Sequence, residues 1–173
     1  MISQIDETIR EYIELIKKDP DVPELHNSLG IALGKKGLYR EAIKEFDIAI
    51  NLRQDYAEAY YNKATVFHMR RKFEDAIMEY NKAISLEPEN AEYHNKLGLA
   101  LSQNGMIDKA IKEFMESIRL EPDFDEAHYN LGNHLAEKGS INEAIKELKE
   151  AERINPDFLE VKEKLKMLEK RKT

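Results

Sequence analysis

Residues 91–124 read AEYHNKLGLALSQNGMIDKAIKEFMESIRLEPDF, and the next 34 residues, 125–158, repeat the pattern as DEAHYNLGNHLAEKGSINEAIKELKEAERINPDF. Before and within this stretch the pair Ala-Ile returns every 34 residues. The pairs are Ala42-Ile43, Ala76-Ile77, Ala110-Ile111 and Ala144-Ile145. A small residue precedes each pair, at Gly30, Ala64, Gly98 and Gly132. Columns that stay in phase over four copies indicate a tandem repeat, in which each copy is one supersecondary element.

Within each copy the apolar residues follow a helical period. In residues 91–124, Leu97 and Leu101 are four apart, and Ala110, Phe114 and Ile118 also follow at steps of four. A glycine separates the two stretches in three copies, where it can end the first helix in the left-handed conformation. These glycines are Gly37, Gly105 and Gly139. Each copy is therefore predicted to be two antiparallel helices of about 12 to 14 residues.

Three local features carry predictions of their own. Arg71 replaces the glycine of the second copy, which predicts a slightly looser junction there. Gln54 replaces a proline that recurs at the ends of the other copies, so the connection at residues 53–57 is expected to run on more helically. Ser140, followed by Glu143, predicts a capping box at the start of the last second helix.

These columns resemble the tetratricopeptide repeat family, over four full repeats: 23–56, 57–90, 91–124 and 125–158. The resemblance implies an all-α, tetratricopeptide-repeat solenoid, built as a right-handed superhelix of antiparallel helix pairs. We interpret residues 1–22 as an N-terminal capping helix, in phase with the second helix of a repeat. Residues 159–173 are interpreted as a C-terminal capping helix, since stacked repeats need a polar-backed helix to cover their last apolar surface.

The resemblance also implies a binding site, because in the family one side of each first helix lines a concave groove. Asn95 and Leu99 lie on that side, opposite Leu97 and Leu101, because residues two apart on a helix are turned by about 200°. The implied peptide-binding groove has three columns, one helical turn apart. They are Asn27, Tyr61, Asn95 and Tyr129; Ile31, Thr65, Leu99 and Asn133; and Lys35, Met69, Gln103 and Glu137.

The first two columns alternate with a period of two repeats. Repeats one and three pair Asn with an aliphatic residue, whereas repeats two and four pair Tyr with a polar one. Two interpretations stay open. Tyr and Asn are common in these columns, and four residues can alternate by chance. Alternatively, Tyr61 and Tyr129 anchor an extended partner, since Tyr is favoured at binding hot spots, and the amides hydrogen-bond its backbone.

Composition narrows the remaining classes of function. The formal net charge of -7 disfavours a nucleic acid partner, which selects for a basic face. The absence of cysteine excludes disulfides and thiolate metal sites. His26, His94 and His128 share one column, which we interpret as a packing position and not a metal site, because neighbouring helix axes stand about 8–10 Å apart. No run approaches the roughly 20 apolar residues of a membrane span.

The sequence thus predicts a non-enzymatic, cytoplasmic scaffold or adaptor for protein–protein interaction, without cofactor, that binds a peptide or helix of a partner in the concave groove. No phosphate-binding loop, nucleophile elbow or metalloprotease motif is present. Two alternatives stay open: a structural homo-oligomer that assembles through the terminal helices, and a regulatory subunit of an enzyme. The identity of the partner is not encoded in any motif.

Overall fold

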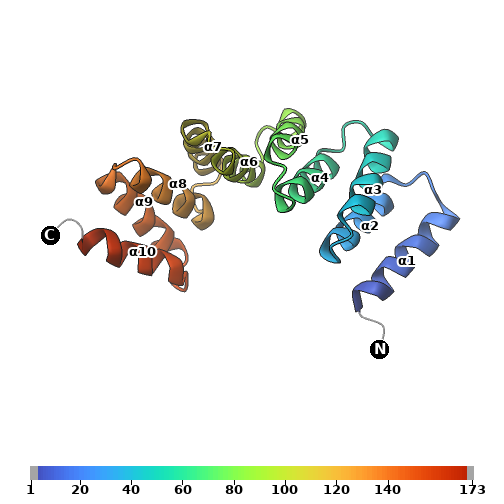
Figure 1. Cartoon of the computed structure of the whole chain (residues 1–173), viewed down its shortest axis with the longest axis horizontal. Helices are drawn as coiled ribbons and strands as arrows, with labels where there is room; N and C mark the ends of the chain where they lie inside the picture. The colour runs from blue at the N-terminus through green and yellow to red at the C-terminus, as the bar shows by residue number, and fades with distance from the viewer. Residues whose placement is uncertain (1–3, 171–173) are drawn as a thin grey trace. The chain divides into compact units, whose positions relative to one another are not determined.

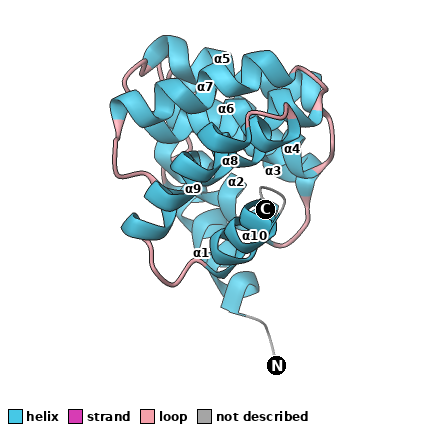
Figure 2. Ribbon diagram, turned by 90° about the vertical axis from the view of Figure 1, so that its left-hand side faces the viewer, coloured by secondary structure: helices cyan, strands magenta, loops and turns pink. Residues whose placement is uncertain are grey.

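A computed structural model describes residues 4–170, and this part of the chain consists of helices joined by short loops (Figures 1 and 2). The first helices of the four repeats are α2 (Pro23–Lys35), α4 (Ala57–Met69), α6 (Ala91–Gln103) and α8 (Asp125–Glu137). The second helices are α3 (Tyr39–Leu52), α5 (Phe73–Leu86), α7 (Ile107–Leu120) and α9 (Ile141–Ile154). The terminal helices are α1 (Gln4–Lys18) and α10 (Leu159–Lys170). The all-α solenoid expected from the repeat is confirmed.

The chain divides into two compact units, an N-terminal unit (Met1–Pro88) and a C-terminal unit (Glu89–Thr173). In the N-terminal unit α2 packs on α3 and α4 packs on α5, while α1 packs on α2. In the C-terminal unit α6 packs on α7 and α8 on α9, while α10 packs on α9. Within the described range no helix is apolar enough over a sufficient length to cross a membrane.

Each hairpin closes over a small residue of its first helix. A methyl group added to Gly30 would lie 2.6 Å from the ring of Phe46, and one added to Gly98 would lie 2.6 Å from the ring of Phe114. Phe46 and Phe114 are completely buried. A larger residue at either glycine would separate the two helices, because close-packed cores do not absorb extra volume without strain.

The first helices end in the predicted left-handed turn. Gly37, Gly105 and Gly139 have φ between 80° and 84°, and Arg71 takes the same place with φ 58°. The amide of the following residue bonds back across the helix end in every repeat, including Lys72 N to Phe67 O at 2.9 Å. The expected loosening at Arg71 is therefore wrong, because the same backbone bonds form with an arginine at this position.

Two other local predictions are also wrong. Ser140 is the N-cap of α9, but its side chain makes no capping bond. Its backbone has ψ 60°, outside the extended range typical of caps, and the same junction forms at Leu38 without any capping side chain. The connection after α3 does not run on helically. Helix α3 stops at Leu52 and α4 starts at Ala57, so Gln54 lies in a turn as the prolines do.

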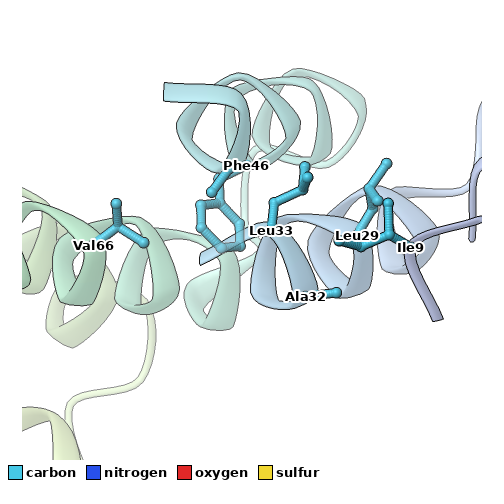
Figure 3. Close-up of a cluster of buried hydrophobic side chains, with 7 residues drawn as sticks. Ile9, Leu29, Ala32, Leu33, Phe46 and Val66 are labelled. Atoms are coloured by element: carbon cyan, nitrogen blue, oxygen red, sulfur yellow. The ribbon is translucent and has the colours of Figure 1, made fainter. Parts of the chain in front are cut away.

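Each unit has its own apolar core. In the N-terminal unit, Ile9 of α1 joins Leu29 and Leu33 of α2, with Phe46 and Val66 on the other side (Figure 3). In the C-terminal unit, one face of α10 covers α9. That face is Val161, Leu165 and Leu168, at 0%, 5% and 0% exposure. The remaining side chains of α10 are charged or exposed.

Candidate functional site

Five of the predicted groove residues come together in one hollow of the N-terminal unit, between α2 and α4. Its volume is about 240 Å³. The predicted residues that line it are Ile31, Lys35, Tyr61, Thr65 and Met69. They share the hollow with Gly34, Phe46, Asn62 and Val66, so the lining is largely apolar.

The hollow exists because two small residues meet between the helices. Gly34 of α2 has no side chain, and the nearest neighbour of its Cβ position is Val66 of α4, at 3.4 Å. Phe46, completely buried, forms part of the floor. Met69 stands at the rim with 56% of its surface exposed. An exposed flexible thioether beside an apolar floor is typical of adaptable binding surfaces.

The tyrosine wall of the hollow is held in place from behind. The Tyr61 ring lies 5.8 Å from the buried Tyr80 ring, at 52° to it. Thr65 Oγ1 donates to Tyr61 O at 3.0 Å and lies 3.1 Å from the Tyr80 hydroxyl. Contacts with Tyr80 of α5 therefore support both Tyr61 and Thr65.

Two predicted groove residues are buried and bonded inside the protein. Asn27 is 2% exposed, and its Oδ1 accepts from Asn62 Nδ2 at 3.0 Å. Its Nδ2 donates to the Tyr56 hydroxyl and to Glu58 Oε1, both at 3.2 Å. In the C-terminal unit, the completely buried Asn95 accepts from Asn130 Nδ2 at 2.9 Å. These amides join neighbouring repeats within each unit, so we leave Asn27 and Asn95 out of the candidate site.

The corresponding space of the C-terminal unit is filled differently. At the positions of Gly34 and Val66 it carries Ser102 and His134. The His134 ring lies 5.2 Å from the Phe114 ring, and its Nε2 bonds to Ser102 Oγ. The remaining predicted residues there are scattered: Leu99, Tyr129 and Asn133 are half-buried, Gln103 and Glu137 are exposed, and the Tyr129 ring packs 4.9 Å from that of Phe158.

The histidine column is a set of buried hydrogen-bonded pairs. His26, His94 and His128 are between 5% and 8% exposed, and the Nδ1 of each lies within 2.8 Å of a glutamate on the second helix. The glutamates are Glu45, Glu113 and Glu147. The hydrogen bond that His128 donates to Glu147 raises the pKa of His128, although burial acts against the charge. Sequence reasoning recognised a packing position but missed these partners, which a constant spacing of 19 residues could have revealed.

The second repeat replaces this pair with a different ion pair. Glu79 is only 7% exposed, and Lys63 Nζ reaches its Oε1 at 2.8 Å and Asp47 Oδ1 at 2.8 Å. Burial acts against the charge of Lys63, but the hydrogen bonds to Asp47 and Glu79 outweigh it and raise its pKa. Lys63 is thus a structural cation on the outer side of α4 and is not available to the hollow.

A second hollow, of about 400 Å³, lies between α1 and α2. Gln4, Ile5, Thr8 and Tyr12 of α1 form one wall, and Ser28, Ile31, Ala32 and Lys35 of α2 form the other. Ile31 and Lys35 thus face both hollows. The sequence analysis treated residues 1–22 only as a cap and did not foresee a surface here, because no column within the repeats points to it.

Comparisons with known proteins agree with this architecture. Two family profiles match, one described as TPR repeat over residues 66–105 and one as Tetratricopeptide repeat over residues 95–157. A comparison with curated protein sequences gives no match.

Several solved structures are similar over almost the whole chain. A crystal structure of MamA is 30% identical, with a TM-score of 0.77, over 95% of this chain and 97% of that one. YrrB, described as a TPR protein with an unusual peptide-binding site, is 23% identical, with a TM-score of 0.77, over 94% of this chain and 84% of its own. TTC0263, a thermophilic TPR protein of Thermus thermophilus, is 20% identical, with a TM-score of 0.77, over 95% and 90%.

Proposed function

Because the chain belongs to the tetratricopeptide repeat family, whose members are generally non-catalytic scaffolds for protein–protein interaction, we propose that its N-terminal unit binds a polypeptide segment of a partner in the hollow between α2 and α4. The observation that carries the proposal is the convergence of five predicted groove residues on one hollow with an apolar floor. YrrB is described as having a peptide-binding site of its own, and that description supports the class of ligand.

The size of the hollow favours a side chain over a free small molecule. Sites for drug-sized ligands usually enclose about 300–1,000 Å³, and this hollow holds about 240 Å³. One large apolar side chain of a partner would bury itself against Phe46 and Val66. The exposed Lys35 at the rim would then favour an acidic residue next to that anchor.

Substitutions at the rim test the proposal. Peptides selected from a random 12-residue display library on the intact chain supply the ligands, and fluorescence anisotropy gives their dissociation constants. Tyr61→Ala and Met69→Ala should each weaken binding by about 1–3 kcal/mol, because a hot-spot side chain loses its contact area. Neither substitution should unfold the protein, since both residues retain solvent contact.

A matched control separates the hollow from general surface stickiness. Met78 on α5 is 57% exposed, against 56% for Met69, and Met78→Ala should leave the affinity unchanged. A second variant, Gly34→Ser with Val66→His, places in the hollow the side chains that the C-terminal unit uses at these positions, and it should abolish binding. If the selected peptides bind all of these variants as tightly as the wild type, the proposed site is wrong.

A further inference from the structure

Helix α1 carries the positions that form the buried face of a second helix, but in α1 these positions are only partly covered. In the four hairpins, three positions of the second helix are 0% exposed. They are Ala42, Phe46 and Ala49; Ala76, Tyr80 and Ala83; Ala110, Phe114 and Ser117; and Ala144, Leu148 and Ala151. The residues 34 positions before the first set are Thr8, Tyr12 and Leu15. Thr8 and Tyr12 are only half-buried, and Leu15 is 43% exposed.

The hollow between α1 and α2 lies between a helix in the register of a second helix and the first helix of the next repeat. Elsewhere in the unit a first helix packs against two helices of these kinds. Helix α2 lies against its own second helix, α3, and against the next first helix, α4. On α4 the side chains that line the space next to α2 include Asn62, Thr65, Val66 and Met69. The residues 34 positions earlier on α2 are Ser28, Ile31, Ala32 and Lys35, and these four line the hollow next to α1. The hollow of about 400 Å³ therefore matches the place of a first helix in front of α1.

Tyr12 defines one requirement for a helix in this place. In two hairpins a phenylalanine at this position faces a glycine of the first helix, as the Phe46 ring lies 2.6 Å from a methyl group added to Gly30. The aromatic Tyr80, the closest counterpart of Tyr12, has Ala64 at that register position. A helix that docks on α1 must therefore present a small residue to Tyr12.

Glu11 defines a second requirement. Its counterparts in the hairpins are Glu45, Glu79, Glu113 and Glu147, and each of them is paired with a cation or histidine of the first helix at 2.7 to 2.8 Å. Across residues 4–170, no hydrogen bond or ion pair satisfies Glu11, which is exposed beside Leu15. In three hairpins the partner is a histidine that stands four residues before the small residue, as His26 precedes Gly30.

We propose that the face of α1 that carries Thr8, Glu11 and Tyr12 docks an amphipathic helix of another protein, which bears a histidine for Glu11 and, four residues later, a glycine or alanine for Tyr12. The incoming helix completes the hairpin that α1 begins, and it extends the stack at its N-terminal end by one first helix. This surface is separate from the hollow between α2 and α4, although Ile31 and Lys35 line both.

A second copy of this chain does not supply that helix. Helices α2, α4, α6 and α8 are each packed against a second helix of their own. Helix α10 is in the register of a first helix, with its residues 34 positions after those of α8, but Lys166 stands where α8 has Gly132. A methyl group at Gly132 would already lie 2.8 Å from Leu148, so a lysine at this position cannot approach Tyr12.

A peptide copy of one of the chain's own first helices tests the proposal on the intact protein. The peptide spans residues 89–104, with His94 and Gly98 at the required spacing. A lactam bridge between its Glu92 and Lys96 side chains keeps this short segment helical, since isolated helices of this length are marginal. Fluorescence anisotropy should show saturable binding, and Thr8→Arg in the protein should weaken it at least about tenfold, or about 1.4 kcal/mol.

The histidine and glycine requirements have their own variants. A peptide with Gly98→Leu should bind about tenfold more weakly. A peptide with His94→Ala should bind the wild type and the Glu11→Ala protein equally, while the parent peptide distinguishes them, which gives a coupling between the two side chains. The exposed Glu41→Gln, which changes the net charge by +1 as Thr8→Arg and Glu11→Ala do, and the rim variant Met69→Ala should leave the affinity unchanged.

The proposal fails if the parent peptide shows no saturable binding. It also fails if Thr8→Arg and Gly98→Leu leave the affinity unchanged and the His94 and Glu11 variants show no coupling. It also fails if a peptide of residues 158–170 binds as tightly as the parent, because the occupant would then be a second copy of the chain. None of these results alters the outcome at Tyr61 and Met69, so this surface and the proposed peptide site are decided separately.

Discussion

At the scale of single residues, the four glutamates of the second helices, of which Glu79 is buried and the others are half-buried, show how one charge is neutralised in two ways. Glu45, Glu113 and Glu147 each meet a histidine, whereas the second repeat has Tyr60 at the histidine position and pairs Glu79 with Lys63. Removing one member of a buried pair leaves the other charge without compensation. The second repeat thus has tyrosine in place of the histidine (Tyr60) and lysine in place of a leucine (Lys63), and these two differences depend on each other.

Restoring the common pattern in two steps checks this dependence. Lys63→Leu alone should lower the free energy of unfolding by about 3 kcal/mol, because Glu79 stays buried without a partner. Lys63→Leu combined with Tyr60→His should return it to within about 1 kcal/mol of the wild type, since His26 and His128 solve the same problem. Urea unfolding midpoints measure both. A double variant as unstable as the single one would contradict the account.

Asn95 offers a second test at this scale. Its Nδ2 is buried and has no hydrogen-bond partner among residues 4–170, whereas Asn27 Nδ2 donates to the Tyr56 hydroxyl at 3.2 Å. The residue 68 positions after Tyr56 is Phe124, which has no hydroxyl. Phe124→Tyr should therefore raise the free energy of unfolding by about 1 kcal/mol, and Tyr56→Phe should lower it by about 1 kcal/mol. Equal melting of Phe124→Tyr and the wild type would show that the hydroxyl does not reach the amide.

At the scale of elements, the helix junctions separate backbone geometry from residue type. Arg71 adopts φ 58° and makes the same bonds as the glycines at the other junctions. The left-handed conformation costs a residue with a side chain about 1–2 kcal/mol, and part of this is offset by the greater freedom of glycine in the unfolded chain.

Arg71→Gly should therefore raise the free energy of unfolding by about 0.5–1 kcal/mol. The mirror exchange, Gly105→Arg, should lower it by about 1 kcal/mol. No atom lies within 4 Å of a methyl group added to Gly105, so a steric clash does not complicate the comparison. The melting temperatures of the Arg71→Gly and Gly105→Arg variants, compared with that of the wild type, test both predictions. A destabilised Arg71→Gly variant would mean that the arginine side chain itself stabilises the turn.

The elements were largely predictable from the sequence, and the site only in part. Columns repeated at 34 residues place Gly30 against Phe46 and Gly37 in its turn, because both depend on features within one repeat. The burial of Asn27 was not predictable, because its partner Asn62 lies in the next repeat and a single helical face does not reveal it. The difference between the two units depends on Gly34 and Ser102, which the groove columns did not include.

At the scale of the whole molecule, stability in a stacked repeat is a sum of local interfaces, so damage stays close to its origin. Leu168 of α10 is completely buried against α9, and Leu168→Ala should cost about 2–4 kcal/mol. Hydrogen exchange should then accelerate in α9 and α10 while the amides of α2 and α3 keep their protection. Leu159→Ala, at a site 67% exposed, is the control and should change neither. Uniform acceleration along the chain would contradict local stability.

The asparagine bridges also bear on how such a chain can change its length. Asn62 donates a hydrogen bond to Asn27, and Asn130 donates one to Asn95. Each of these bridges joins two neighbouring repeats, and the second bridge lies 68 residues after the first. Deletion of residues 57–124 would bring Asn27 opposite Asn130 and keep a bridge, whereas deletion of residues 57–90 would bring it opposite Lys96. Shortened or lengthened versions of this protein should therefore fold best when hairpins are removed or added in pairs.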